Sequence, residues 1–470
     1  MKLQQIPESQ IIEKVKFENH WWNDKKIDEH YAAMPRRIYF NIFIQIVNEA
    51  KDDRAVVLLG QRGIGKTAML SHTIQALIDA GKPANQISLT SFAIPIFKGL
   101  DLESVVKFNL KALNIKSADD LIFIFEEIQY LDEWEVQLEK IAKKYPKALF
   151  IGSSSIGIKS KNKRKKHSKR FHAFVLPILS FYEFIEIRNQ QNTIYFDDDE
   201  FSQKQIDIFN QHFLNYINYG NYSSVVLSTK IDSEQIRSES NRYLHSILLR
   251  DLPNLYGINK LHKLNSFTSF LAYNSGIETN VEELAQQSGY QKETVIKYLN
   301  YLEHIFLIKR IYRFNDRHTD ERDDLYFRIY ITNVSMRTAL FTPLTVDDIR
   351  TEYMVETAIL AQWQHIEKDM FYYCKHDHVF IDLIKVDNNK NPVWITDVRW
   401  QHPHGLQHNE LDIVGHFCGK HGLLSSMITT KQTRDIIPSS NVIHSYEPAS
   451  LYCYSIGKQI VENKMIDKRV

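Results

Sequence analysis

The stretch AVVLLGQRGIGKT, residues 55–67, decides the fold of this chain. Its first five residues are apolar and predict a buried strand, and the next eight fit the pattern G-x-x-x-x-G-K-T. A helix is expected from about Thr67 to Ala80. Glycines let the backbone N–H groups of such a loop converge on phosphate oxygens, and the helix N-terminus adds partial positive charge. A strand, this loop and a helix in succession predict a nucleoside triphosphate site.

Each loop residue has an expected part in holding ATP. Lys66 is expected to reach the β- and γ-phosphates and to take part in catalysis, and the hydroxyl of Thr67 to ligate Mg²⁺. The predicted nucleotide-binding set is Gly60, Gln61, Arg62, Gly63, Ile64, Gly65, Lys66, Thr67 and Ala68.

A second apolar run, residues 121–125, ends in two acids. A continuous apolar run is typical of a parallel strand that is buried on both faces. Glu126 is the expected Mg²⁺ ligand, and Glu127 the expected general base that polarises the water attacking the γ-phosphate. The alternative is that the pair is surface charge.

A third strand, residues 148–151, runs into Gly152 and three serines. Strands and helices alternate from about residue 36 to 190, which predicts an α/β fold with a parallel sheet and helices on both faces. Ligands of open α/β sheets lie at the carboxyl ends of the strands. One serine of 153–155, with Ser154 as the candidate, is therefore expected to contact the γ-phosphate or the lytic water. A simple turn is the alternative.

Composition limits the class of protein. The 470 residues carry 58 Lys and Arg against 57 Asp and Glu, so no global charge favours nucleic acid, and local patches must do so. No apolar run could span a bilayer, the first residues do not resemble a signal peptide, and three cysteines are too few for a disulfide framework. A cytoplasmic protein with no membrane partner is expected.

The predicted organisation is a helical lead-in (1–35), a P-loop ATPase domain (36–190), a helical lid (191–261), a winged helix (262–340) and a nuclease-like α/β domain (341–470).

Residues 262–335 follow the order helix, helix, glycine turn, helix and apolar hairpin. This order is typical of a winged helix-turn-helix. In the third helix Lys292, Lys297 and Asn300 are expected to face outward. They favour DNA contact, but the two lysines beside Glu293 are few, so a structural or protein-docking winged helix is equally open. A basic run at 159–170 is a second candidate for nucleic-acid phosphates, with a solvated insertion as its alternative.

With these motifs, the chain resembles the prokaryotic AAA+ ATPases that join a P-loop domain, a winged helix and a C-terminal restriction-endonuclease-like domain. The resemblance rests on residues 60–67, on E-E-I-Q-Y at 126–130, on G-S-S-S at 152–155 and on L-P-I-L-S-F-Y-E-F at 176–184. It implies that Asp usually stands where this chain has Glu126. It also implies that Arg170 acts as an arginine finger or an intramolecular clamp on the phosphates.

The resemblance implies a nuclease-like centre in residues 350–435. The matching positions are Asp382 on one strand, Asp397-Val398-Arg399 on the next and Glu356 on a helix, with Lys385 as a possible substitute cation. Asp397 is shorter than the usual Glu, and Arg399 is planar where Lys is compact. The domain is therefore predicted to be inactive. His402, His404 and His408 match no fixed zinc spacing, and a solvated loop is favoured over a metal site.

These observations predict an Mg²⁺-dependent ATPase whose cycle drives conformational change coupled to DNA. The alternatives are a slow nucleotide switch that binds a protein partner or a second copy of the chain, and an ATP-controlled nuclease.

Overall fold

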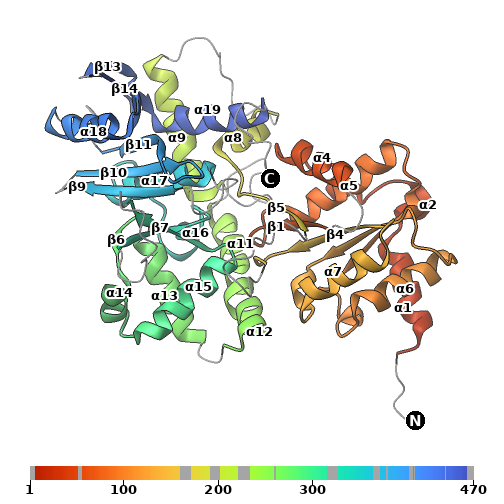
Figure 1. The fold of residues 1–470 in the computed structure, drawn as a ribbon. Helices are drawn as coiled ribbons and strands as arrows, with labels where there is room; N and C mark the ends of the chain where they lie inside the picture. The colour runs from red at the N-terminus through yellow and green to blue at the C-terminus, as the bar shows by residue number, and fades with distance from the viewer. Residues whose placement is uncertain are drawn as a thin grey trace. The chain divides into compact units, whose positions relative to one another are not determined.

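The computed structural model describes residues 6–50, 55–158, 171–190, 202–220, 233–258, 261–314, 326–363, 371–376, 379–401, 406, 408–439 and 441–462 (Figure 1). They form two compact units, the first ending at Leu176 and the second beginning at Pro177. Each unit has its own sheet. None of the helices in the described ranges combines the length and hydropathy that a bilayer crossing requires.

The first unit begins with four helices, α1 (Glu8–Glu18), α2 (Trp21–Asp24), α3 (Glu29–Ala32) and α4 (Phe40–Glu49). Its strands are β1 (Ala55–Leu59), β2 (Ile87–Ser91), β3 (Ile122–Glu126), β4 (Leu149–Ser154) and β5 (Phe171–Val175). Between them lie α5 (Lys66–Asp79), α6 (Leu102–Leu113), α7 (Trp134–Lys144) and the short 3₁₀ turns η1 (Ala84–Gln86), η2 (Pro95–Phe97) and η3 (Ile128–Tyr130).

The strands of the first unit pair in the order β2-β3-β4-β1-β5, and every pairing is parallel. The predicted parallel sheet is confirmed. All five residues of β1 are buried, and so are the first four of β3, as expected for strands covered on both faces. Strand β3 lies next to β4, and β4 lies next to β1. Because these strands are parallel, their carboxyl ends lie at one edge of the sheet, beside the loop that follows Leu59.

The N-terminal helices close the free edge of β2. The side chain of Asn19 pairs with both backbone groups of Leu89, accepting from its N–H at 2.6 Å and donating to its carbonyl at 3.0 Å. The indole N–H groups of Trp21 and Trp22 both donate to the carbonyl of Ile87, at 3.0 and 2.8 Å. An uncovered edge strand is a template for unwanted pairing, and here side chains satisfy it. The predicted lead-in is thus part of the first unit.

The second unit opens with helices α8 (Phe181–Gln190), α9 (Gln203–Tyr219), α11 (Ser233–His245), the π-helical segment η5 (Ser246–Asp251) and α12 (Leu252–Tyr256). It continues through α13 (Leu261–Tyr273), β6 (Glu278–Thr279), α14 (Val281–Ser288), α15 (Lys292–His304), β7 (Ile308–Arg313), β8 (Phe327–Ile331) and α16 (Met336–Leu340). It ends with α17 (Arg350–Gln362), β9 (Phe371–His376), β10 (Val379–Val386), β11 (Pro392–Arg399), α18 (His408–His421), β12 (Ser425–Thr430), β13 (Asp435–Ser439), β14 (Val442–Pro448) and α19 (Ala449–Val461).

One sheet runs through the segments that the sequence assigns to separate domains. Its described strands pair in the order β13-β14-β12-β11-β10-β9-β7-β8-β6. The join is a short parallel pairing of β7 with β9, where Tyr312 lies opposite Tyr372 and Arg313 opposite Tyr373. Residues 262–340 and 341–470 therefore share a sheet.

The helix α8, predicted as the end of the ATPase domain, belongs to the second unit. It begins with a capping box, because Ser180 Oγ accepts from the N–H of Glu183 at 3.1 Å and Glu183 Oε2 accepts from the N–H of Ser180 at 3.0 Å. The N–H of Phe181 donates to the Gln362 side chain of α17, which ties this helix to the C-terminal part of the unit.

Candidate functional site

The loop after β1 has the conformation that its glycines permit. Gly60 has φ +146°, and a Cβ there would lie 2.5 Å from Ile64 Cδ1 and 2.7 Å from the carbonyl oxygen of Leu176. Gly65, directly before α5, has φ +98°. Side chains are strained in this region of φ, so the loop can turn sharply into the helix only because these residues are glycine.

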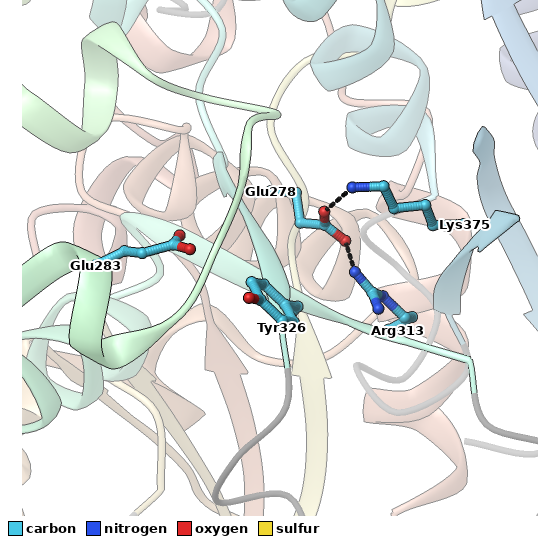
Figure 2. Close-up of a pocket in the computed structure, with 5 residues that line it drawn as sticks. All are labelled: Glu278, Glu283, Arg313, Tyr326 and Lys375. Carbon is cyan, nitrogen blue, oxygen red and sulfur yellow. Dashed lines mark hydrogen bonds and ion pairs between the residues drawn. The ribbon is translucent and has the colours of Figure 1, made fainter. Parts of the chain in front are cut away.

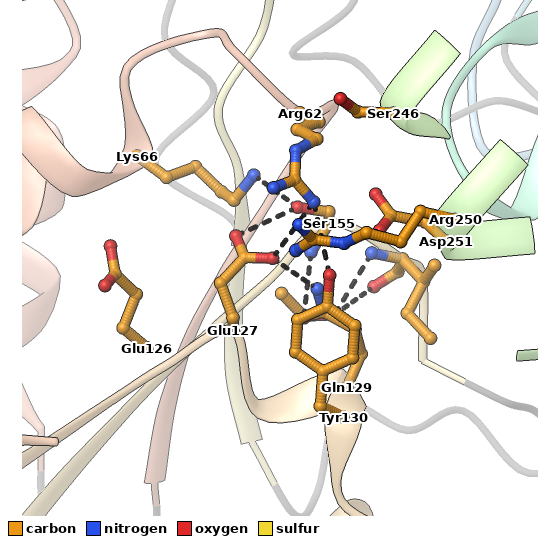
Figure 3. Close-up of polar contacts among 12 residues, drawn as sticks. Arg62, Lys66, Glu126, Glu127, Gln129, Tyr130, Ser155, Ser246, Arg250 and Asp251 are labelled. Carbon is orange, nitrogen blue, oxygen red and sulfur yellow. Dashed lines mark hydrogen bonds and ion pairs between the residues drawn. The ribbon is translucent and has the colours of Figure 1, made fainter. Parts of the chain in front are cut away.

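Lys66 lies at the centre of the loop. Its side chain is buried, and Nζ donates to the carbonyls of Gly60 (2.9 Å) and Gln61 (3.1 Å). Nζ also donates to Ser155 Oγ at 2.9 Å (Figure 3). These three acceptors hold the ammonium group between the loop and the end of β4. A phosphate oxygen entering the loop would compete for the same three N–H donors.

Thr67 and Glu126 form the predicted metal-ligand pair. The hydroxyl of Thr67 donates to Glu126 Oε1. Burial raises the pKa of the Glu126 carboxyl, although the hydrogen bond from Thr67 opposes this rise. A hydroxyl and a carboxylate in contact are oxygen donors of the kind that Mg²⁺ takes in proteins, so these residues fit the ion. A cation there would also offset the burial of the carboxylate.

Glu127 is held in a tight position beside the loop. Its backbone is left-handed, with φ +53°, a conformation that non-glycine residues adopt uncommonly and chiefly at functional positions. Its Oε2 accepts from Gln129 Nε2 at 2.6 Å, and its Oε1 accepts from Ser155 Oγ at 3.2 Å. The carboxylate thus contacts the hydroxyl of Ser155 at the end of β4, and the same hydroxyl contacts Lys66.

The structure places Ser155, and not the predicted Ser154, between Lys66 and Glu127. Ser154 Oγ donates to the carbonyl of Ile156 at 2.9 Å and accepts from its N–H at 3.1 Å. Ser154 is the last residue of β4, and its buried side chain closes this local turn. Ser155 is the first residue past the strand, where its hydroxyl reaches both Lys66 and Glu127.

Three further residues join the site. Gln129 donates to Glu127 and also accepts from the N–H of Ser155 at 3.3 Å. Arg62, expected only as a loop residue, places Nη1 3.2 Å from the hydroxyl of Tyr130 and 3.9 Å from Glu127 Oε2. Arg37 donates to the carbonyl of Ile64 at 2.7 Å. The E-E-I-Q-Y stretch drew attention to Gln129 in the sequence, whereas no motif near Arg37 predicted that it would contact the loop. The predicted Arg170 and the basic run at 159–170 lie outside the described residues.

The acids of the predicted nuclease-like centre meet an arginine from β8. Arg328 Nη1 lies 2.6 Å from Glu356 Oε1 and 2.9 Å from Asp382 Oδ1. Asp382 Oδ2 also accepts from the N–H of Val398 at 2.9 Å, and Arg399 Nη2 lies 3.2 Å from Asp397 Oδ2. Strands β8, β10 and β11 belong to one sheet, and α17 packs against β11.

The protonation of this centre differs from that of exposed acids. Burial raises the pKa of Glu356 to about 8, against the opposing charge of Arg328. Burial and the nearby Asp382 raise the pKa of Asp397 well above its ordinary value. Lys385 lies over the ring of Trp363, 5.6 Å from its centroid. In the described parts of the chain, no three His, Cys, Asp or Glu side chains are placed to hold a metal ion, and His402 and His404 fall outside those parts.

One of the two lysines on the exposed face of α15 has an acidic partner, and the other, Lys297, lies over the ring of Tyr301. Lys292 pairs with Glu282 at 2.9 Å, and Arg310 pairs with Glu303 at 2.5 Å and donates to Asn300 at 2.8 Å. Further along the helix, the ring of Tyr256 from α12 stacks on Tyr301 with centroids 3.9 Å apart.

A polar pocket of about 530 Å³ lies beside β6, lined by Glu278, Glu283, Arg313, Tyr326 and Lys375. Figure 2 shows Lys375 and Arg313 both pointing at Glu278. Lys375 Nζ lies 2.8 Å from Glu278 Oε2, and the hydroxyl of Tyr373 donates to Oε1 at 2.8 Å. Although burial opposes it, these donors hold the pKa of Glu278 below its ordinary value. The pocket's cations are therefore already paired with a carboxylate.

Comparison with known proteins assigns two segments. Residues 52–185 match the model of a family described as an AAA domain, and residues 210–348 match that of a domain of unknown function, DUF8612. Residues 52–185 therefore form an AAA-type P-loop domain, consistent with the parallel sheet and the loop geometry. The second match runs from within α9 to beyond α16, across the predicted lid and winged helix.

Two individual proteins are similar to the chain. An uncharacterized protein of Haemophilus influenzae is 23% identical over 286 residues, which cover 59% of this chain and 67% of that protein. The structure of AMPPCP-bound DnaA from Aquifex aeolicus is 10% identical, with a TM-score of 0.23, over 56% of this chain and 86% of that one. That superposition is too loose to define a shared arrangement.

Proposed function

We propose that the protein binds ATP with Mg²⁺ and hydrolyses it at the end of β1, β3 and β4. The observation that carries this proposal is the chain of contacts from Lys66 through Ser155 to Glu127. Lys66 and the loop N–H groups bind the phosphates, Thr67 and Glu126 hold the metal, and Glu127 polarises the attacking water. The match of residues 52–185 to an AAA domain supports the assignment.

Ser155 takes the part first expected of Ser154 in this proposal. Its hydroxyl touches both the phosphate-binding cation and the general base, so it responds to the γ-phosphate when Lys66 turns towards it. Arg62 adds a second cation to the loop, close to Glu127. Removal of the γ-phosphate then changes the contacts of all three residues together, which is the basis for a conformational cycle.

The proposed output is a winged helix formed by residues 262–340. The order α13-β6-α14-α15-β7-β8, with β6 and β7 both antiparallel to β8, supports this fold. Coupling to DNA through α15 and residues 159–170 remains the primary proposal for the partner. The paired charges of Lys292 and Arg310 specifically favour the second candidate, a slow nucleotide switch that docks a protein or another copy of the chain.

The two candidates differ in salt dependence. A DNA-dependent ATPase should turn over faster with duplex DNA, and this stimulation should fall steeply between 50 and 200 mM salt because phosphate contacts release counterions. A protein-docking switch should show equal rates with and without DNA. Loss of ATP hydrolysis in a Glu127→Gln variant that still binds ATP is the test of the ATPase itself. Unchanged hydrolysis in that variant would reject Glu127 as the base.

The C-terminal part is proposed to bind without cutting. Phosphodiester hydrolysis at acids of this kind needs carboxylates that hold a divalent metal. Two of the three acids contact Arg328 instead. Plasmid DNA incubated with Mg²⁺ or Mn²⁺, with or without ATP, should stay intact with the wild type and with Asp382→Ala alike. Cleavage by the wild type alone would make the protein an ATP-controlled nuclease.

A further inference from the structure

The buried acid centre of the second unit has a cation of its own. Arg328 is 5% exposed, Glu356 4%, Asp382 5% and Asp397 2%. One guanidinium nitrogen contacts a carboxylate oxygen from α17 and another from β10. Two aromatic rings also lie against the guanidinium, whose carbon is 4.5 Å from the centroid of the Phe380 ring and 5.0 Å from that of Tyr373. The arginine is therefore enclosed by two acids and two rings.

Three buried carboxyl groups in one place need compensation. Removing a carboxylate from water costs several kcal/mol unless a cation and hydrogen bonds replace the water. Glu356 has Arg328 and the hydroxyl of Tyr330, and Asp382 has Arg328 and the N–H of Val398. Asp397 Oδ2 has Arg399, whereas its Oδ1 is buried with no hydrogen-bond partner among the described residues. The centre therefore has acceptor capacity that the arginine does not reach.

The acids do not fit the metal ion that a nuclease-like centre implies. Mg²⁺ demands oxygen ligands at about 2.0–2.1 Å in near-octahedral order. The shared nitrogen of Arg328 already lies between Glu356 and Asp382, and a guanidinium cannot give up its proton in a protein to make room. A divalent ion would have to expel a buried side chain that is packed against two aromatic rings.

We propose that Arg328 is a built-in replacement for a divalent metal ion at Glu356, Asp382 and Asp397. The wild-type centre is closed to divalent cations, and loss of the guanidinium charge opens it to one. The arginine also connects β8 to α17 and β10. A metal ion in an active nuclease would take part in catalysis, whereas the guanidinium here stabilises the contact between the two parts of the sheet.

The test measures Mn²⁺ binding to the full chain without nucleotide, by the paramagnetic resonance signal of free Mn²⁺. Arg328→Gln should bind one ion more than the wild type, and Arg328→Gln with Asp382→Asn should lose that ion. Arg328→Lys keeps a positive charge at the centre and should exclude the ion as the wild type does. Either of two results would overturn the proposal. The first is that the wild type binds an ion that Asp382→Asn loses, and the second is that Arg328→Gln binds no extra ion.

Thermal melting gives a second readout that does not depend on activity. Arg328→Gln should melt roughly 5–15 °C below the wild type in EDTA, because two buried acids lose their partner. Mn²⁺ at about 100 times its Kd should restore roughly 5–10 °C of that loss and leave the wild type unmoved. If Arg328→Gln does not fold in EDTA, refolding in Mn²⁺ should recover its transition. Failure to refold in both solutions would reject the metal replacement.

Discussion

Replacing Asn19 by leucine should uncouple the N-terminal helices from the sheet that carries the phosphate-binding loop. Asn19 is fully buried, and its side chain makes two hydrogen bonds with Leu89 and donates to the carbonyl of Val15 at 2.7 Å. Leucine has a similar volume but neither donor nor acceptor. The substitution therefore leaves the N–H and carbonyl groups of Leu89 without partners at the edge of β2.

The magnitude follows from those two groups. A buried backbone group left without a partner costs about 1–3 kcal/mol. The contact with Leu89 is only part-buried, so water can recover some of this loss, and we expect the free energy of unfolding to fall by roughly 2–4 kcal/mol. Domains are stable by only about 5–15 kcal/mol, so this is a large share.

Hydrogen exchange of the full chain, read on the peptide that contains β2, measures the effect. Amide exchange there should accelerate by at least about 30-fold, since each 1.4 kcal/mol of opening free energy is a factor of ten. Asn23→Leu is the matched control, because Asn23 is exposed four residues further along. Equal exchange of β2 in the wild type and in Asn19→Leu would refute the view that this side chain closes the sheet edge.

The remaining predictions concern the nucleotide site and pH. Lys66→Ala should weaken ATP binding by roughly 10- to 100-fold, since charge-assisted hydrogen bonds are lost, and calorimetry that finds equal affinity would contradict the loop assignment. Ser155→Ala should lower kcat by roughly ten-fold or more with little change in KM. Ser154→Ala should lower the stability and leave the rate of the folded enzyme intact. A loss of kcat in Ser154→Ala and not in Ser155→Ala would restore Ser154 as the contact residue. His444 is buried with its Nδ1 2.7 Å from Ser426 Oγ, and burial lowers its pKa below 6.5. Because the unfolded chain takes up that proton first, stability should fall below about pH 6.5 by up to about 1.4 kcal/mol per pH unit, and His444→Gln should flatten this fall in urea titrations at pH 5 to 7.

Local patterns were sufficient to predict the central elements. The apolar runs at 55–59 and 121–125 became β1 and β3, because a strand buried on both faces needs apolar side chains at every position. The glycine spacing after β1 requires positive φ at Gly60 and Gly65, and the helix begins at Lys66, one residue before the expected start. These features depend on neighbouring residues, so they can be read along the chain.

The tertiary structure decided which side chains meet. Whether Ser154 or Ser155 reaches Lys66 depends on where β4 ends, and a shift of one residue turns a strand side chain to the opposite face. Asn19 meets β2 across 70 residues, and Arg328 meets Glu356 and Asp382 from a strand predicted to lie in another domain. Hydrogen bonds and ion pairs act over a few ångströms in space and leave no periodic pattern in the sequence, so only the assembled sheets bring these partners together.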